Sequence, residues 1–131
     1  MHAANAPVAG TGKSYLFDCV AAIATGRLMP VMAAGRNEEE TEKRLGAAIM
    51  TGQALIDVDN VNGEIGGDAL CQLLERPIVD VRVLGESRQV RVEARGTTVF
   101  CTGNNIVVSD DLVRRVIKTN LDPKVERPEA A

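Results

Sequence analysis

The chain has 131 residues, of which 45% are hydrophobic and 25% are charged, and its net charge at pH 7 is −3. This length and composition predict one globular domain with a buried core, and they exclude a disordered or fibrous chain. The slightly negative net charge attracts no polyanion, so any contact with nucleic acid must come from a local basic patch. The sequence has no apolar run near 18 residues and no signal-peptide pattern, and we therefore expect an intracellular protein without a membrane span.

The first half of the chain predicts alternating strands and helices. Residues 2–6 predict a short strand, and residues 13–24 predict a helix because their apolar side chains recur at helical spacing. The apolar run at residues 29–33 predicts a short buried strand. Asn37 predicts the N-cap of a second helix, whose first turn is three glutamates that complement the positive helix end. The side chains expected to face inward from this helix are Leu45, Ala48 and Ile49.

The second half continues the alternation and adds a hairpin. Residues 54–58 predict a strand followed by the turn-rich stretch VNGEIGG, and residues 68–74 predict a helix that ends before Pro77. Valines alternate with polar residues at 79–83 and 90–92 on either side of a turn, which is typical of a β-hairpin. Two further core strands are expected at 97–101 and 116–121, with a helical start at Asp110 or Asp111 between them. The fold class predicted is α/β, a mainly parallel sheet flanked by helices with an inserted hairpin.

The cysteines and the histidine predict no chemistry. Cys19, Cys71 and Cys101 are far apart in the sequence and have apolar neighbours, so we expect buried, reduced thiols instead of a metal site or a disulfide framework. His2 is the only histidine, and it has no companion ligand. We expect no catalytic role for it.

The stretch APVAGTGKS, residues 6–14, lies between the first strand and the first helix, where parallel sheets bind ligands. Gly10 and Gly12 let the backbone wrap with its N–H groups inward, and the following helix adds its positive end. Lys13 would reach the β- and γ-phosphates, and the Ser14 hydroxyl would ligate Mg²⁺. Pro7 replaces the first glycine of the general pattern without disturbing the glycines nearest the phosphates. The predicted ligands are ATP and Mg²⁺, contacted by Ala9, Gly10, Thr11, Gly12, Lys13, Ser14 and Tyr15.

The stretch LIDVDN, residues 55–60, is an apolar strand that ends in acidic residues, as a Walker B motif does. A buried unpaired carboxylate is costly, so at least one of the two aspartates should face the site. We expect Asp59 to bind the metal, directly or through water, with Asp57 as the alternative register. Asn60 takes the place where many ATPases have a glutamate that polarises water. Asparagine orients water but is a poor base, so hydrolysis is slow or another acid such as Glu64 assists.

Two further patterns follow in TTVFCTGNNI and SDDLVRRVI. The first predicts a core strand that delivers Asn104 beside the strand of Asp59, where it contacts the γ-phosphate or the attacking water. The alternative is that Asn104 and Asn105 only form a turn. The second carries Arg114 and Arg115. Paired surface arginines are usually solvated or ion-paired, but an ATPase that lacks its own transition-state arginine can receive one from a neighbouring subunit.

In this order, PxxGTGKS, a strand with DN, a hairpin, TGNN, DLVRRVI and LDPKVERPE, the motifs span about residues 3–129. The chain resembles the ATPase domain of phage and prophage primase-helicase replication proteins, AAA+ ATPases akin to superfamily 3 helicases. The resemblance implies that Asn104 is the sensor 1 residue and that Arg114 or Arg115 is an arginine finger acting in trans. It therefore implies a homo-oligomeric ring, expected to be a hexamer. It also implies a phage- or prophage-encoded protein in the cytoplasm of a bacterial host.

The resemblance places the hairpin at residues 79–94 where a pre-sensor hairpin lines the central pore and grips DNA. The sequence adds its own support, because Arg82, Arg88 and Arg91 fall on its polar face or beside its turn. Phosphate contact by such a hairpin is electrostatic and weakens steeply with salt. The alternative is an exposed hairpin with alternating charge and no ligand.

These observations predict that residues 1–131 form a P-loop ATPase domain, as a fragment or one domain of a longer replication protein. The predicted function is a motor that couples ATP hydrolysis to DNA translocation or unwinding, as in a helicase. One alternative is an AAA+ loader or remodeller that acts on protein. Another is a nucleotide-dependent oligomerisation switch with slow hydrolysis, which Asn60 favours. No primase active site and no helical lid are recognisable in the sequence.

Overall fold

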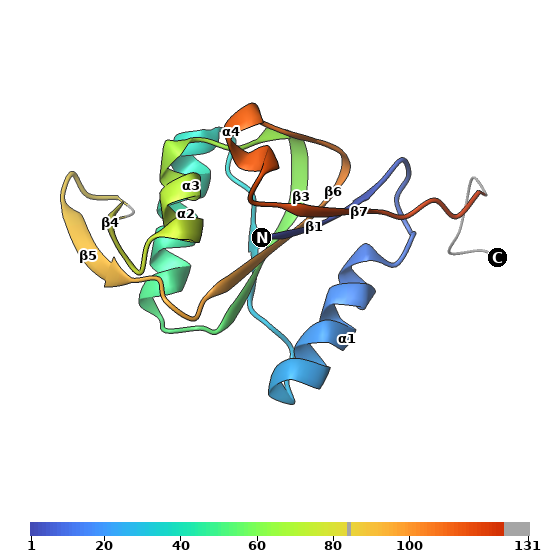
Figure 1. Cartoon of the computed structure of the whole chain (residues 1–131), viewed down its shortest axis with the longest axis horizontal. Coiled ribbons are helices and arrows are strands. Elements are labelled where there is room, and N and C mark those ends of the chain that lie inside the picture. The colour runs from blue at the N-terminus through green and yellow to red at the C-terminus, as the bar shows by residue number, and fades with distance from the viewer. Residues whose placement is uncertain (84, 125–131) are drawn as a thin grey trace.

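The computed structural model of the chain describes residues 1–83 and 85–124 (Figure 1). Five parallel strands form one sheet in the order β2-β3-β6-β1-β7, and β4 and β5 form a separate antiparallel hairpin. The α/β class with an inserted hairpin is therefore confirmed. The strands are β1 (His2–Ala6), β2 (Val31–Ala33), β3 (Leu55–Ile65), β4 (Ile78–Arg82), β5 (Gln89–Glu93), β6 (Thr98–Val108) and β7 (Ile117–Asn120).

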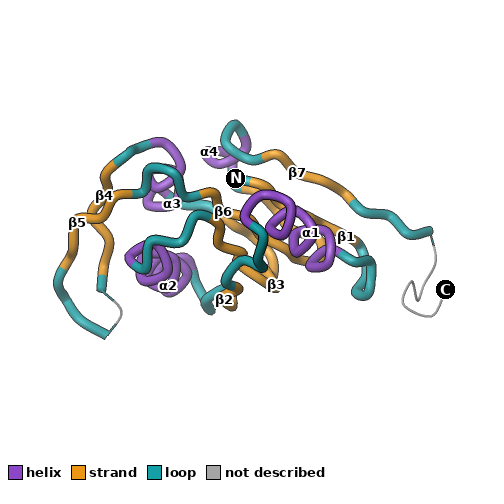
Figure 2. The backbone as a smooth tube through the Cα atoms, turned by 90° about the horizontal axis from the view of Figure 1, so that it is seen from below, coloured by secondary structure: helices purple, strands orange, loops and turns teal. Residues whose placement is uncertain are grey.

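Helices cover both faces of the sheet (Figures 1 and 2). Helix α1 (Lys13–Thr25) packs on one face through Phe17 and Ala21, which contact Phe100 and its neighbours. Helices α2 (Glu38–Met50) and α3 (Asp68–Glu75) and the single turn α4 (Asp110–Val113) share a second, larger core with the other face. The sheet thus separates two hydrophobic clusters.

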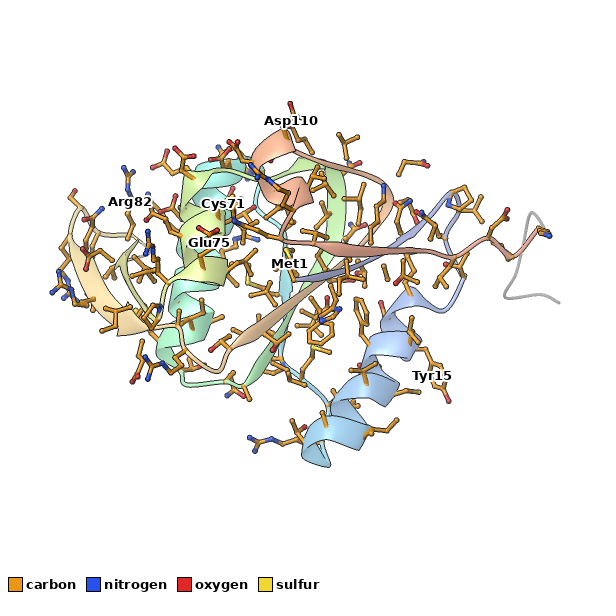
Figure 3. The ribbon with its side chains drawn as sticks, in the orientation of Figure 1. Met1, Tyr15, Cys71, Glu75, Arg82 and Asp110 are labelled. Carbon is orange, nitrogen blue, oxygen red and sulfur yellow. The ribbon has the colours of Figure 1, made fainter. Side chains whose placement is uncertain are left out.

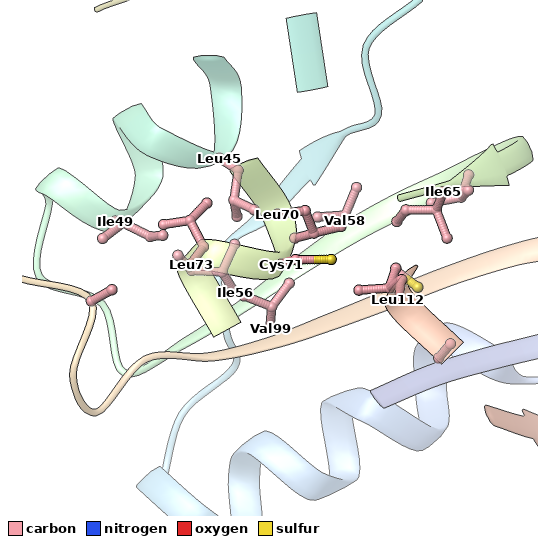
Figure 4. Packing of buried hydrophobic residues seen from close by; sticks show 14 of the residues in the cluster. Leu45, Ile49, Ile56, Val58, Ile65, Leu70, Cys71, Leu73, Val99 and Leu112 are labelled. Atoms are coloured by element: carbon pink, nitrogen blue, oxygen red, sulfur yellow. The ribbon is translucent and has the colours of Figure 1, made fainter. Parts of the chain in front are cut away.

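The larger core determines which way the acidic residues of β3 point. Ile56 and Val58 are buried on the side of α2 and α3 (Figure 4), and burying one such side chain stabilises the fold by about 1.5–3 kcal/mol. Because successive side chains of a strand point to opposite faces, Asp57 and Asp59 are directed to the side of α1. The hydrophobic pattern of one strand therefore directs both carboxylates toward the loop that precedes α1.

The hairpin packs on α2. Val79 and Val81 are buried, and an added Cβ at Gly46 of α2 would lie 2.9 Å from the Cβ of Val81. The two elements therefore approach too closely for any larger residue than glycine to fit without movement. The opposite face of the hairpin carries the exposed side chains of Asp80, Arg82 and Arg91.

The predicted helix starts and the predicted inward face of α2 are confirmed. The Asn37 side chain accepts a hydrogen bond from the Glu40 N–H at 2.8 Å, as an N-cap should. Leu45 and Ile49 are buried and Ala48 is partly buried against the same core.

The three cysteines are free thiols, Cys71 and Cys101 buried and Cys19 half-buried. His2 is half-buried and stacks on Phe100 with ring centroids 5.2 Å apart, so its ring packs against the smaller core on the α1 side.

Two strands, β3 and β6, are longer than the sequence predicted. The stretch VNGEIGG was expected to be turn-rich, but β3 continues through it to Ile65 and pairs with β6. The pairing shifts register between Val58 and Val61, and Asn60 has a φ of 57° there. The turn-forming residues mark β-bulges within the strand and not its end.

The prediction of a buried strand at residues 29–33 is wrong for most of that run. Met29 is buried, but β2 is an edge strand and Val31 is 58% exposed.

Among the described residues, no helix is long and apolar enough to cross a membrane. The motif LDPKVERPE begins at Leu121, and its residues beyond Lys124 lie outside the described ones.

Candidate nucleotide-binding site

The loop between β1 and α1 has the backbone that an anion site requires. Gly10 and Gly12 have φ values of 75° and 84°, a region that disfavours side chains with a Cβ. Gly12 is the N-cap of α1, and no described side chain caps that helix end. The first N–H groups of α1 are therefore available to an anion. Ser14 and Tyr15 at the start of α1 are exposed, and Tyr15 points outward from the helix (Figure 3).

Lys13 is the first residue of α1, and its side chain reaches Asn104 of the central strand β6. Its Nζ donates to Asn104 Oδ1 at 2.9 Å and to Thr11 Oγ1 at 3.2 Å. Burial lowers the pKa of the Lys13 ammonium, and the attraction of Asp59 opposes that shift. Both hydrogen-bond acceptors are uncharged, so the positive charge of Lys13 is only weakly compensated. Such a group attracts phosphate.

Asp59 and Asp57 have different surroundings, although both belong to β3. Asp59 is half-buried and its Oδ1 accepts a hydrogen bond from Thr102 Oγ1 at 2.7 Å. Asp57 is 3% exposed, and its Oδ1 has no hydrogen-bond partner among the described residues. Burial first, and then the charges of Asp59 and Asp18, raise the pKa of Asp57 to about 6. Asp59 is thus the carboxylate placed beside Lys13.

Asn60 and Glu64 lie where β3 passes the end of β2. Both line a cavity of about 370 Å³ at the carboxyl ends of these strands. Asn60 is exposed, and its backbone N–H donates to Thr102 Oγ1 at 3.4 Å. This arrangement brings the residue expected to orient water close to the one expected to assist it.

The strand predicted at residues 97–101 was expected to end before Asn104, and that end is wrong. Strand β6 continues to Val108, and Asn104 pairs with Ala6 of β1 and Asn62 of β3. The alternative that Asn104 and Asn105 form only a turn is therefore excluded. The pairing of β6 with β1 ends at Asn104, but β3 pairs with β6 as far as Val108 and so continues the strand.

Thr102 is a residue that sequence reasoning missed. It is 2% exposed and lies two positions before Asn104 on the same strand, so both side chains face the loop. A polar residue within the run VFCT was the only available indication. Its contacts with Asp59 and Asn60 make it part of the site.

The two arginines after α4 differ in their partners. Arg115 Nη2 lies 2.5 Å from Glu75 Oε1 of α3, and the guanidinium also donates to the backbone oxygen of Asp111. The backbone oxygen of Arg115 accepts from the Met1 amino group at 3.0 Å. Arg114 is exposed and makes no ion pair with any residue in the described ranges.

The hairpin arginines are all exposed, and each has an acidic partner. Arg82 lies 3.1 Å from Glu39 of α2, Arg91 lies 3.1 Å from Asp80, and Arg88 pairs with Glu86. Exposed ion pairs contribute about 0–1 kcal/mol each. The pairs are therefore easily exchanged for other anions. In Figure 1 the hairpin lies at the opposite end of the molecule from α1 and its preceding loop.

No protein-family model matches the chain, and no curated protein matches its sequence. Solved structures do match it. A JCV helicase structure with a bound small molecule has a TM-score of 0.60 at 15% identity, covering 95% of this chain and 36% of that one. A second JCV helicase structure has a TM-score of 0.55 at 16% identity, covering 95% and 35%. The apo A form of the NrS-1 C-terminal region has a TM-score of 0.57 at 12% identity, covering 93% and 28%.

At these identities the matches establish the fold. The chain shares the fold of the JCV helicase structures and of the NrS-1 C-terminal region over 93–95% of its length, as the resemblance led us to expect. The chain spans about a third of the length of the structures that it matches, 28–36%.

Proposed function

We propose that residues 1–131 form the ATP-hydrolysing motor domain of a phage-type primase-helicase, which works as a ring on DNA. The observation that carries this proposal is the convergence of three elements at one edge of the sheet. Lys13 at the start of α1 bonds to Asn104 of β6 at 2.9 Å, and its charge interacts with Asp59 of β3. The fold shared with JCV helicase and the NrS-1 C-terminal region supports the same conclusion.

The residues present fit ATP with Mg²⁺. The backbone N–H groups around Gly10 and Gly12 would hold the phosphates, and Lys13 would bind their outer oxygens. Ser14 and the free oxygen of Asp59 would hold Mg²⁺, which offsets phosphate charge when bound. Lys13 would then leave the oxygen of Asn104, whose amide becomes free to contact the γ-phosphate or the attacking water. The exposed Asn60 would orient that water, with Glu64 in the same cavity.

We propose Arg114 as the finger that completes the site of a neighbouring copy. Arg115 is occupied by Glu75 and by the oxygen of Asp111, whereas Arg114 is exposed and has no described ionic partner. Arg115 would fix the end of α4 and thereby present Arg114. A positive charge at the transferring phosphoryl group can raise turnover by about 10³–10⁵-fold.

The test is the rate of ATP hydrolysis with Mg²⁺ over a range of protein concentrations, with and without single-stranded DNA at low salt. We expect the rate per chain to rise with protein concentration, because a shared site needs a neighbour, and to rise again with DNA. A rate that DNA leaves unchanged at every concentration would remove the main support for a translocating motor.

The same assay tests a second candidate, a nucleotide-dependent oligomerisation switch. The observation that favours it is Asn60, because an asparagine amide cannot take a proton from water. A switch predicts ATP binding and self-association with turnover below detection, whether or not DNA is present.

A further inference from the structure

The hydroxyl of Thr102 joins the two central strands at the candidate site. Thr102 lies in β6 and is 2% exposed. Its Oγ1 donates to Asp59 Oδ1 at 2.7 Å and accepts the N–H of Asn60 at 3.4 Å. Burying a hydroxyl without partners costs about 1–3 kcal/mol in proteins, and here the group acts both as donor and as acceptor. Both of its bonds end on the part of β3 where the pairing shifts register.

The bond to Asp59 affects which group that carboxylate can bind. Thr102, which donates to Asp59, and Asn104, which accepts from Lys13, lie two positions apart on the same face of β6, so the carboxylate and the ammonium are neighbours. A carboxylate free to rotate there would pair directly with Lys13, and both charges would be lost to a nucleotide. Lys13 instead bonds to Asn104 and Thr11, while Thr102 occupies Asp59 Oδ1. The second oxygen of Asp59 stays available to a cation.

The bond from Asn60 fixes the backbone beside the metal ligand. Asn60 has a φ of 57°, a left-handed conformation that asparagine tolerates better than most residues. Its N–H has an acceptor in the Thr102 hydroxyl, so the same side chain holds a carboxylate and the backbone of the following residue. One hydroxyl thus sets the relative position of Asp59 and Asn60.

We propose that Thr102 is a positioning residue for the Mg²⁺ site: it holds the Asp59 carboxylate away from Lys13, so that Asp59 binds the cation and Lys13 binds phosphate. This inference rests on the proposed function and names a residue outside its motifs. Thr102 acts through Asp59 and contacts neither nucleotide nor metal itself. Loss of a hydrogen-bond partner behind a metal ligand typically weakens metal affinity by about 10–100-fold.

The test measures binding of a fluorescent ATP analogue to the full chain while Mg²⁺ is titrated, starting in EDTA. Thr102→Val keeps the shape of the side chain and removes the hydroxyl. We expect the Mg²⁺ concentration for half-maximal tightening to rise by about tenfold or more in this variant. Because Lys13 becomes paired, Mg²⁺-free binding should weaken in parallel. Thr102→Ser keeps the hydroxyl and should restore both values to near those of the wild type.

A second matched pair covers the case in which Thr102→Val does not fold. Thr102→Ala and Thr102→Ser both lack the methyl group and differ only in the hydroxyl, so the Mg²⁺ dependence should separate them in the same direction. Equal Mg²⁺ dependence within either pair of folded proteins would overturn the inference. Wild-type protein that binds no nucleotide with or without Mg²⁺ would instead refute the proposed function.

Discussion

Asp57 and Asp59 are two residues apart on one face of β3, and burial separates their chemistry. Asp59 has a hydroxyl donor and a nearby ammonium, whereas Asp57 lies beneath α1 with an unpaired oxygen. Burial raises the pKa of Asp57 to about 6 from an ordinary value of 3.8. Between pH 3.8 and about 6 the Asp57 carboxyl is protonated in the folded state and ionised in the unfolded state. The contribution of Asp57 to stability is therefore full below pH 3.8 and is lost as the pH rises through about 6.

We predict that Asp57→Asn stabilises the Mg²⁺-free protein by about 1–3 kcal/mol at pH 7.5, because it removes a buried negative charge. At pH 4.5 the free energies of unfolding of wild type and variant should differ much less, since Asp57 of the folded protein is then mostly protonated. Chemical denaturation at the two pH values measures this difference. An equal loss of stability at both pH values would show that the Asp57 charge carries no cost in the folded state.

At the residue scale the sequence predicted the groups that have a motif. The loop from Gly10 to Ser14 was predictable because glycine, lysine and serine at that spacing have one common use. Thr102 was not predictable, because a single hydroxyl in an apolar strand is equally consistent with a core position. Only the strand order β3-β6 places it against Asp59.

At the scale of elements, the types were predictable and the lengths were not. Asn60, Gly63 and Asn105 look like turn residues, and each has a positive φ, but all three lie inside long paired strands. The exposure of β2 depends on its place at the edge of the sheet, which no local pattern encodes. The hairpin was predictable because its valines alternate and its polar face is charged.

The hairpin also gives a prediction about DNA. Replacing Arg82, Arg88 and Arg91 together by alanine should weaken binding of single-stranded DNA. It should also reduce the slope of log affinity against log salt by about 2, because each lost phosphate contact removes about 0.7. The structural cost should be small, since all three arginines are exposed. Fluorescence anisotropy at several salt concentrations measures both effects.

The matched control is Arg27→Ala, an exposed arginine after α1 and away from the hairpin. It should leave the salt slope within error of the wild type. An unchanged slope in the triple variant would mean that these arginines serve only their acidic partners Glu39, Asp80 and Glu86.

For the whole molecule, the sheet separates the two halves of the proposed catalytic machinery. The loop precedes α1 on one face, and the arginines follow α4, which packs against the core of the other face. The simplest arrangement is thus one in which the arginine of a second copy contacts a nucleotide bound at this loop. Sequence reasoning reached this arrangement through a family resemblance, because no local pattern encodes a partner.

We predict that Lys13→Ala and Arg114→Ala each lower the rate of ATP hydrolysis by about 10³-fold when assayed alone. Mixtures of the two should recover part of the activity, because some interfaces then join an intact loop to an intact arginine. Arg115→Ala provides the comparison, and it should also destabilise the fold because it breaks the pair with Glu75. If Lys13→Ala protein recovered no activity in any mixing ratio with Arg114→Ala or with Arg115→Ala, the result would contradict a shared site.

The most direct measurement is a calorimetric titration of ATP with Mg²⁺ into the wild-type chain and into Lys13→Ala. The account predicts one ATP per wild-type chain and a loss of about tenfold or more in affinity on removing the Lys13 ammonium. The melting temperature without nucleotide should stay the same, because the Lys13 ammonium bonds only to Asn104 and Thr11 among the residues that the structure describes. Wild-type protein that binds no ATP, or a variant that binds it equally well, would contradict the claim that this loop is a nucleotide site.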